Sequence, residues 1–301
     1  MSARKQPGAL GGTVLLNDEL VPAAQATISA LDRGFLYGDG LFEAVRTYRG
    51  RPFGLAQHLA RLAASARAFR IPFRRDAAYW RPRIAQLLRA NALDTTDAAV
   101  RLTVSRGAGA LGLRPAKGLR PTTLLLATPL DARIERAQRR GIGVCFFPYR
   151  LVTATLPSHK TLHYLPAVLG KMLAARSGAW EAIYLDGTDH VLEGTTSNVF
   201  LVRNGAIMTP PLHGILPGVT RRFLTTVARR ARIPLREAAI TRTDLLAADE
   251  VFLTASTIEV LPVVRVARRR IGGGRPGPTT RRLQRAYKGL VRAALGHIII
   301  K

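Results

Sequence analysis

Three segments of the chain combine residue types that can carry out chemistry, and the first of them surrounds a lysine. Lys160 lies in the sequence SHKTLHYL at positions 158–165, between an expected apolar strand and an expected apolar helix. An apolar environment disfavours the ammonium form of lysine, which would leave a free amine for Schiff-base chemistry near neutral pH. Most lysines lie on solvated faces, so this segment alone leaves both interpretations open.

The second segment pairs an acid with an expected anion site. Glu193 lies in LEGTTSNVF at 192–200, where a glycine and three hydroxyl residues follow it between apolar stretches. In GILPGVTR, the Pro217–Gly218 turn predicts a helix that starts at Val219, and free N–H groups at a helix start bind anions. The chain has no GxxxxGK[ST] motif, so a single phosphate monoester fits this site better than a nucleoside triphosphate.

The third segment is glycine-rich and lies near the N-terminus. In DRGFLYGDGLFE at 32–43, Gly34, Gly38 and Gly40 predict a loop with positive backbone angles, or a close backbone approach, that leads into a strand. A plain turn before an edge strand is the alternative interpretation.

The elements that position these segments follow from hydrophobic periodicity. The expected strands are Thr13–Leu16, Ala26–Ser29, Leu41–Tyr48, Arg51–Leu55, Ala99–Ser105, Thr122–Thr128, Ile142–Phe147, Glu181–Asp186, Val199–Arg203 and Val251–Thr254. The expected helices are Ala56–Phe69, Ala77–Asn91, Leu165–Ser177, Val219–Ala231 and Thr279–Ala294. The polar stretch Pro129–Arg140 is expected to be a connector, so the pattern predicts two α+β domains with a hinge near residue 133.

The net charge of the chain raises a different function class. Lys and Arg total 46 against 19 Asp and Glu, a net charge of +27, and such a surface attracts polyanions. The arginines are spread along the chain, and the one dense cluster, Arg268–Arg270, has no finger, RNP-like or helix-turn-helix pattern beside it. A nucleic-acid-binding protein therefore stays as the alternative of another class, and specific nucleic-acid binding is disfavoured.

Cysteine content and hydropathy limit the remaining classes. The single cysteine, Cys145, excludes a disulfide framework and a cysteine metal cage, and its apolar neighbours predict burial in a strand. No metal site is expected. No apolar stretch approaches the ~20 residues that span a bilayer, and the polar N-terminus has no secretory signal, so we expect a cytoplasmic protein.

Seven motifs in a fixed order connect these segments with a known family. They are RGFLYGDGLFE, HLARL, SRG, KTLHY, LEGTTSN, ILPGVTR and EVFLTASTIEVLPV. From about residue 13 to about residue 290 the chain resembles the class IV, fold-type IV pyridoxal-phosphate enzymes, which include branched-chain aminotransferases, D-amino-acid aminotransferases and aminodeoxychorismate lyases. The resemblance implies a two-domain α+β fold like that of D-amino-acid aminotransferase. A smaller N-terminal α/β domain would cover 1–130, a linker 131–138, and a larger, β-barrel-like C-terminal α/β domain that binds the cofactor 139–301.

The resemblance also implies a role for each matching residue. Lys160 would form the Schiff base with pyridoxal 5'-phosphate and move the proton, and Glu193 would face the pyridine nitrogen. Arg61, in HLARL, would bind the cofactor phosphate with its guanidinium fork. The remaining expected cofactor contacts are the backbone amides of Val219 and Thr220, a hydroxyl of Ser256 or Thr257, Leu216 against the ring face, and Tyr164.

The resemblance leaves the substrate open among three branches. Tyr37, Phe42 and Arg101 match branched-chain enzymes, and Arg101 would bind the distal carboxylate of 2-oxoglutarate or glutamate. D-amino-acid enzymes carry an Arg-x-His trap that SRGAGALGLRP lacks. That same loop is closer to the lyases of 4-aminobenzoate synthesis, although Glu43 and EGTTSN favour a transaminase.

The predicted function is therefore a branched-chain-type aminotransferase that uses a 2-oxo acid in a ping-pong reaction. The D-amino-acid enzyme and the lyase are kept as alternatives. A homodimer is implied by the resemblance. A cofactor-binding module without catalysis is disfavoured, because Lys160, Glu193 and Arg61 are all present.

Overall fold

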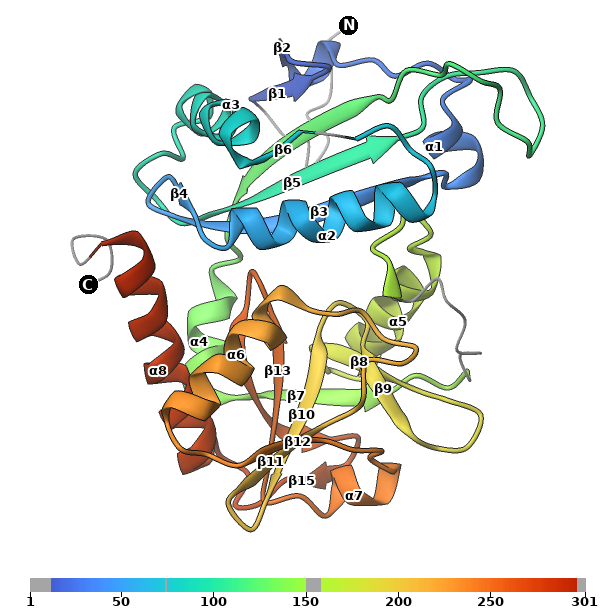
Figure 1. Ribbon diagram of the computed structural model, residues 1–301. Helices are drawn as coiled ribbons and strands as arrows, with labels where there is room; N and C mark the ends of the chain where they lie inside the picture. Colours follow the sequence, from blue (N-terminus) through green and yellow to red (C-terminus); the bar gives the residue numbers. More distant parts are fainter. Residues whose placement is uncertain (1–11, 74, 150–157, 297–301) are drawn as a thin grey trace, which may run out of the picture. The chain divides into compact units, whose positions relative to one another are not determined.

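A computed structural model describes residues 12–73, 75–149 and 158–296 of the chain (Figure 1). The chain divides into two compact units, Met1–Leu130 and Asp131–Lys301. Each unit has its own β-sheet with helices packed against it, as the strand and helix patterns predicted.

The first unit contains a sheet with the strand order β2-β1-β6-β5-β3-β4, all of whose neighbouring strands are antiparallel. Its strands are β1 (Thr13–Leu16), β2 (Glu19–Pro22), β3 (Gly40–Tyr48), β4 (Arg51–Pro52), β5 (Ala98–Ser105) and β6 (Thr123–Pro129). Its helices are η1 (Ala23–Gln25), α1 (Arg33–Tyr37), α2 (Leu55–Ala68) and α3 (Ala77–Ala90).

Helices α2 and α3 cover the sheet of the first unit with the apolar faces that the sequence predicted. α2 packs on β3, and α3 packs on β1 and β6. Leu59 and Leu62 from α2 join the fully buried Trp80 and Leu87 from α3 in one core cluster with the strands. Residues three or four positions apart on a helix share one face, so each helix presents a continuous apolar stripe to the sheet.

The second unit contains a larger mixed sheet. Its strand order is β12-β11-β10-β13-β14-β7-β8-β9, with β15 paired to β14. The strands are β7 (Ile142–Phe146), β8 (Glu181–Leu185), β9 (Val191–Gly194), β10 (Asn198–Arg203), β11 (Ala206–Thr209), β12 (Leu235–Glu237), β13 (Glu250–Ala255), β14 (Glu259–Val266) and β15 (Arg269–Arg270). β7 runs parallel to β8 and β14, and β11 runs parallel to β12.

Helices of the second unit pack on this sheet and on one another (Figure 1). They are α4 (Arg133–Arg140), α5 (Leu165–Arg176), α6 (Val219–Arg230), α7 (Arg242–Leu246) and α8 (Pro278–Leu295). α5 packs on β8, α6 packs on α8, and α4 and α8 both pack on β14.

One expected strand was wrong, and another is shorter than expected. The region Ala26–Ser29 is irregular, and the strand that pairs with β1 is instead β2, because Asn17 and Asp18 adopt positive φ angles of 49° and 75° and close a two-residue hairpin there. The strand expected at Arg51–Leu55 ends at Pro52, because Gly54, with φ of 65°, starts helix α2.

Two expected loops contain helices. The connector predicted at Pro129–Arg140 contains α4, whose few apolar residues, Ile134 and Ala137, are buried. In the glycine-rich segment, the residues after Asp32 form α1, which ends at Gly38 in the left-handed conformation with φ of 66°. Of the three glycines singled out there, Gly38 alone has positive φ.

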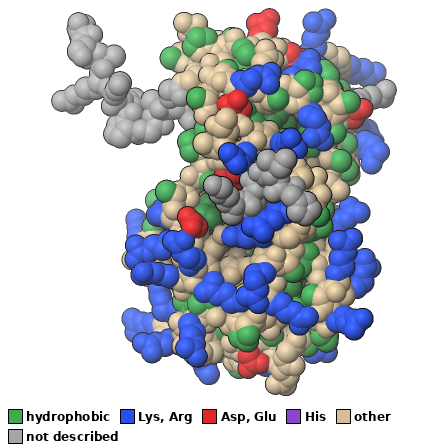
Figure 2. All heavy atoms as spheres, turned by 90° about the vertical axis from the view of Figure 1, so that its left-hand side faces the viewer, with side chains coloured by type: hydrophobic (Ala, Val, Ile, Leu, Met, Phe, Trp, Pro, Cys, Tyr) green, Lys and Arg blue, Asp and Glu red, His purple; other side chains and the backbone are tan. Residues whose placement is uncertain are grey.

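Arginine side chains tie the helices of the second unit to one another. Arg282 on α8 donates a hydrogen bond of 2.7 Å to the carbonyl oxygen of Ala231 at the end of α6. Arg281 donates to the carbonyl oxygen of Arg139 on α4. Exposed Lys and Arg side chains are dense on the face of this unit that Figure 2 shows. Within the described ranges, no helix is both long and apolar enough to cross a membrane.

Candidate active site

Lys160 lies just before helix α5 in the second unit, beside a tyrosine of the same segment. Its Nζ donates a hydrogen bond of 3.1 Å to the Oη of Tyr164, the residue that precedes α5. Both side chains are partly exposed. A spacing of four residues thus places an amine beside a phenol, which is an arrangement suited to proton exchange between the two groups.

Glu193 lies on β9, and one oxygen of its carboxylate accepts both of the hydrogen bonds described for it. Its Oε2 accepts from the backbone N–H of Leu216 at 3.1 Å and from Nδ2 of Asn198 at 3.2 Å. Burial raises the pKa of Glu193 to about 8, although the Leu216 N–H and the nearby charge of Lys160 act in the opposite direction. The structure therefore brings the predicted lysine and the predicted acid within electrostatic reach. Desolvation disfavours the carboxylate form of Glu193, and a cationic or N–H partner would stabilise that form.

Asn198 links Glu193 to the start of helix α6. Besides Glu193, its Nδ2 donates to the carbonyl oxygen of Leu216 at 2.9 Å. A Cβ atom on Gly218 would lie 2.0 Å from Oδ1 of Asn198, so this close approach requires glycine. α6 begins at Val219, and in the part of the chain that the structure describes no side chain caps its start. The first N–H groups of α6 could bind an anion, and the anion site expected from GILPGVTR stays a prediction.

The turn between β13 and β14 contains the two expected hydroxyl residues, Ser256 and Thr257. Asn198 pairs with Thr254 across β10 and β13, so this turn begins two residues beyond the Asn198 pair. The side chain of Asn198 lies against Gly218 at the start of α6, and its backbone pairs with β13 two residues before this turn. Backbone amides and hydroxyls of this kind are common phosphate ligands.

An apolar wall with one tyrosine borders these polar groups. Tyr184 is 6% exposed and packs edge-on against Phe147, with ring centroids 5.1 Å apart. Burial, together with the nearby charges of Glu193, Tyr164 and Glu181, raises the pKa of Tyr184 well above its ordinary value. The phenol therefore stays neutral and can act as a hydrogen-bond donor.

Arg61, the predicted phosphate ligand, lies in the first unit and binds Glu43, which also contacts His58. Its Nε and Nη2 donate to the two carboxylate oxygens of Glu43 at 2.8 and 2.7 Å, and Nδ1 of His58 lies 2.7 Å from Oε2. Burial alone would raise the pKa of Glu43, but Arg61 and His58 lower it to about 2. The two-bond contact fixes the plane of the guanidinium group.

We predict that Arg61→Ala weakens both cofactor retention and folding. Glu43 is 1% exposed, so the variant leaves a buried carboxylate without its guanidinium, at a cost of about 3–5 kcal/mol in unfolding free energy. The double variant Arg61→Ala/Glu43→Gln should recover most of the stability and none of the cofactor affinity. Urea unfolding and cofactor titration separate the two effects, and cofactor affinity equal to wild type in the double variant would contradict the phosphate role.

The three expected substrate residues also lie in the first unit. Phe42 on β3 and Arg101 on β5 are side by side, with the guanidinium carbon of Arg101 3.6 Å from the Phe42 ring centroid. Phe42 is 2% exposed, so its ring packs against the Arg101 guanidinium and is itself almost inaccessible to solvent. Tyr37, at the end of α1, is partly exposed, and its Oη accepts a hydrogen bond of 3.0 Å from the backbone N–H of Gly112.

The family of the chain follows from comparison with known proteins. A sequence model of the family described as amino-transferase class IV matches residues 40–266. The chain belongs to the class IV aminotransferases. Members of this family use pyridoxal phosphate, as the order of motifs predicted.

Curated relatives of this class IV aminotransferase include branched-chain-amino-acid aminotransferases and D-alanine aminotransferases. It is 37% identical over 279 residues to a Methanocaldococcus jannaschii protein whose name assigns it provisionally to the branched-chain-amino-acid aminotransferases, covering 92% of this chain and 96% of the relative. It is 32% identical over 281 residues to a D-alanine aminotransferase of Bacillus licheniformis, with the same two coverages.

Solved structures of branched-chain enzymes have the same fold. The Escherichia coli branched-chain amino acid aminotransferase matches with a TM-score of 0.86 and 30% identity, covering 93% of this chain and 94% of that one. The branched-chain aminotransferase of the thermophilic archaeon Thermoproteus uzoniensis, solved with norvaline, matches with a TM-score of 0.85 and 29% identity, covering 95% of this chain and 96% of that one. The expected two-domain fold-type IV architecture is thereby confirmed.

Sequence reasoning missed a buried acid that explains part of the EGTTSN motif. Glu181 on β8 is fully buried, and its Oε1 accepts from Oγ1 of Thr195 at 2.9 Å and from Oγ1 of Thr196 at 3.0 Å. Lys171 Nζ lies 3.3 Å from its other oxygen. Two of the hydroxyls after Glu193 therefore bind a neighbouring carboxylate. A lone polar residue at the start of the apolar strand EAIYL was the available signal.

Proposed function

We propose that this class IV aminotransferase moves an amino group between an aliphatic, branched-chain-type amino acid and a 2-oxo acid such as 2-oxoglutarate, in a ping-pong reaction with pyridoxal 5'-phosphate held on Lys160. One observation carries the proposal. Lys160 and Tyr164 place an amine in hydrogen-bond contact with a phenol, and the same unit contains Glu193, a partly buried acid with a raised pKa on which the charge of Lys160 acts.

The donor set of the second unit fits the proposed cofactor. When bound, pyridoxal phosphate supplies an aldehyde for a lysine and a protonated ring that withdraws electrons. Glu193 would hold the proton on the ring nitrogen, because an N–H partner would stabilise its partly buried carboxylate. The start of α6, with Val219 and Thr220, and the turn with Ser256 and Thr257 would bind the phosphate. Leu216, whose N–H anchors Glu193, would border the ring.

Lys160 has the second task of moving a proton. Once its Nζ is released by the incoming amino group, it would remove the proton from the substrate α-carbon as a general base. Tyr164, 3.1 Å from Nζ, would orient the amine for this transfer. The apolar wall with Tyr184 would exclude water from the reacting atoms.

The substrate assignment depends on the first unit and on the relatives. Arg101 stacks on Phe42 and presents a guanidinium, which suits the distal carboxylate of glutamate or 2-oxoglutarate. The branched-chain enzymes among the relatives and solved structures support an aliphatic partner substrate. The D-alanine enzymes among the relatives make chirality the first property to measure.

A substrate panel tests this assignment. L-leucine and L-glutamate should each reduce the absorbance near ~410–420 nm of the purified enzyme, while D-alanine and D-glutamate should leave it unchanged. Turnover is then measured with 2-oxoglutarate or pyruvate. A response to the D-amino acids alone would assign the chain to the D-amino-acid branch, and release of 4-aminobenzoate from aminodeoxychorismate would assign it to the lyases.

We also propose that the enzyme is a homodimer. Leu165, Val168, Leu169 and Met172 form an exposed apolar stripe at helical spacing on α5. Such a stripe on a surface helix favours association. Light scattering should give twice the chain mass, and Met172→Glu should lower it. A cytoplasmic location stays a prediction from the sequence, and specific nucleic-acid binding is not part of this proposal.

A further inference from the structure

The buried carboxylate of Glu181 on β8 accepts hydrogen bonds from the turn at 194–197, which joins β9 to β10. Its Oε1 accepts from the Oγ1 atoms of Thr195 and Thr196 at 2.9 and 3.0 Å, and from the backbone N–H of Thr196. The N–H of Gly194 closes the turn by donating to the carbonyl oxygen of Ser197 at 2.7 Å. One carboxylate oxygen of β8 therefore holds both residues at the tip of the turn.

The two ends of this turn carry the side chains of the acid site. Glu193 directly precedes the turn, and Asn198, which donates to its Oε2 at 3.2 Å, directly follows it. A Cβ atom on Gly194 would lie 2.9 Å from Oε1 of Glu181, so this close approach of the turn requires glycine. A shift of the turn would therefore move Glu193 relative to Asn198.

Helix α5 contacts both Glu181 and the turn. Nζ of Lys171 on α5 lies 3.3 Å from Oε2 of Glu181. A Cβ atom on Gly170 would lie 2.4 Å from Cγ2 of Thr195, so α5 packs directly against the tip of the turn. Glu181 is thus the point at which α5, β8 and the turn between β9 and β10 meet.

This meeting point links the segment of the proposed cofactor lysine with the strand of the acid. α5 begins directly after Tyr164, whose Oη accepts a hydrogen bond of 3.1 Å from Nζ of Lys160. The aldehyde-bearing carbon and the nitrogen lie at opposite ends of the pyridine ring of the cofactor. Lys160 and Glu193 must therefore be held at a spacing that matches the ring, and Lys171 with Glu181 connects the two elements that carry them.

The charge of Glu181 also acts on Glu193. Burial raises the pKa of Glu193 to about 8, and the negative charge of Glu181 acts in the same direction. The N–H of Leu216 and the charges of Lys160 and Arg221 act in the opposite direction. A change at Glu181 therefore has an effect on Glu193 that can be measured without the cofactor.

A buried carboxylate is a costly way to hold a turn. Glu181 is fully buried, whereas the side chain of Lys171 is 38% exposed, so solvent weakens the attraction between them. Apolar residues of similar volume often replace a buried ion pair without loss of stability. The carboxylate is therefore better explained by the geometry that it imposes on the turn than by a gain in folding free energy.

We propose that Glu181, paired with Lys171, is a positioning residue for the cofactor. Its carboxylate fixes the turn at 194–197 against α5, and this holds Lys160 and Glu193 at opposite ends of the pyridine ring. All of these residues belong to the second unit. The inference deepens the proposed aminotransferase function and rests on it.

The substitution Glu181→Gln tests the carboxylate while nearly keeping its shape. The amide oxygen still accepts hydrogen bonds from the turn, but the uncharged side chain does not pair with Lys171. We expect kcat with L-leucine and 2-oxoglutarate to fall about 10- to 100-fold, with KM for L-leucine within about twofold of wild type, because displaced reacting groups slow the chemical step.

Glu250→Gln is the matched control for this variant. Glu250 on β13 is also buried and accepts from a threonine hydroxyl, that of Thr280, at 2.6 Å, but it caps the start of α8. Its replacement should lower the free energy of unfolding and leave kcat unchanged. An equal loss of kcat in Glu250→Gln and Glu181→Gln would reduce Glu181 to a structural role and overturn the inference.

A second variant keeps the inference testable if Glu181→Gln does not fold. Lys171→Met removes the partly exposed cation and leaves Glu181 in place. It should lower kcat with little change in KM, whereas Lys288→Met, at an exposed position on α8, should behave as wild type. Wild-type kcat in Lys171→Met and in any folded Glu181→Gln protein would overturn the positioning role.

Measurements on the cofactor-free protein do not depend on turnover. The side-chain carboxyl signal of Glu193 in a ¹³C NMR titration is identified by its absence in Glu193→Gln. In Glu181→Gln the pKa of Glu193 should fall below about 8, because loss of a neighbouring negative charge favours the carboxylate. The amides of 194–198 should exchange with solvent about tenfold faster than in wild type.

These measurements separate the inference from the proposed function. A wild-type pKa of Glu193 together with wild-type exchange rates in Glu181→Gln would overturn the positioning role. A wild-type protein that transfers no amino group would instead refute the proposed function, and the cofactor-free measurements would still decide whether Glu181 positions the turn.

Discussion

Lys160→Ala is expected to abolish transamination, because Nζ of this residue has two tasks: it links the cofactor and it moves the α-proton. The variant should retain the fold, since Lys160 lies outside the helices and strands and is partly exposed. Turnover should fall by at least about 10⁴-fold, the upper range for loss of a positioned acid–base group. Steady-state assays with L-leucine and 2-oxoglutarate measure this directly.

Chemical labelling identifies the lysine independently of turnover. Borohydride reduction should attach the cofactor to the peptide that contains Lys160 in wild type and to no peptide in Lys160→Ala. Lys288→Ala, on the exposed side of α8, is the control and should label as wild type does. Cofactor found on another lysine, or turnover near wild type in Lys160→Ala, would contradict the assignment of Lys160 as the cofactor-binding lysine.

Glu193→Gln is expected to lower turnover by about 100-fold or more while the cofactor stays bound. A carboxylate that faces the ring nitrogen keeps that nitrogen protonated, and a glutamine of nearly the same shape does not. Loss of one pre-organised electrostatic partner in an active site costs on this scale. Glu135→Gln, with an exposed carboxylate on α4, is a control of the same chemistry in the same unit. Turnover equal to wild type in Glu193→Gln would show that another residue is the partner of the ring nitrogen.

The raised pKa of Glu193 also predicts how stability depends on pH in the cofactor-free protein. The carboxyl has a pKa of about 8 when folded against an ordinary value of 4.5, so between these values the folded state keeps a proton that the unfolded state releases. The contribution of Glu193 to unfolding free energy therefore falls as pH rises from about 4.5 to about 8. Glu193→Gln does not titrate, so it should gain stability over wild type between pH 5 and pH 8 in urea unfolding. Parallel curves for the two proteins would contradict the raised pKa.

The sequence predicted the parts of the fold and site that depend on local patterns. The helices α2, α3, α5, α6 and α8 have apolar residues at helical spacing, and their observed bounds agree closely with the expected ranges. The start of α6 at Val219 followed from a Pro-Gly turn. Lys160 and Glu193 were proposed from motif order, and the structure brings them within electrostatic reach.

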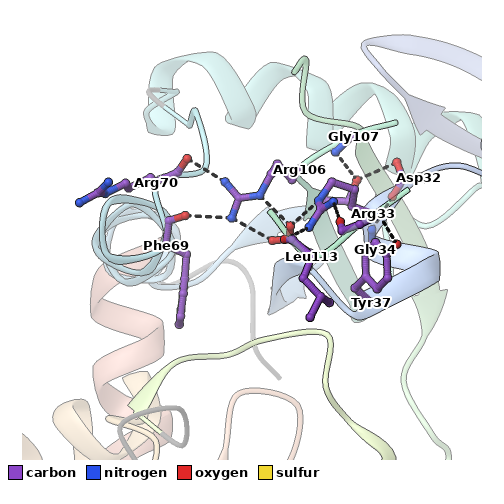
Figure 3. Close-up of polar contacts among 12 residues, drawn as sticks. Asp32, Arg33, Gly34, Tyr37, Phe69, Arg70, Arg106, Gly107 and Leu113 are labelled. Carbon is purple, nitrogen blue, oxygen red and sulfur yellow. Dashed lines mark hydrogen bonds and ion pairs between the residues drawn. The ribbon is translucent and has the colours of Figure 1, made fainter. Parts of the chain in front are cut away.

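Features that depend on distant partners escaped sequence reasoning. Asn198 contacts Glu193 and Leu216, which lie 5 and 18 residues away, and no spacing rule connects these positions. Helix α4 was missed because most of its residues are charged or polar and its buried residues are few. Arg33 bonds the carbonyl oxygen of Leu113, 80 positions away (Figure 3), and no local pattern reveals this contact before the strands are paired.

Many arginines in this chain donate hydrogen bonds to backbone carbonyl oxygens, and this kind of acceptor affects the stability of the protein in acid. A carboxylate partner becomes neutral as pH falls through its pKa, whereas neither a guanidinium nor a peptide carbonyl titrates in that range. The links from Arg282 to Ala231 and from Arg281 to Arg139 therefore keep their strength at low pH. Acidification should first weaken contacts such as that of Arg203 with Asp244, so the packing of α4, α6 and α8 is expected to outlast the surface ion pairs.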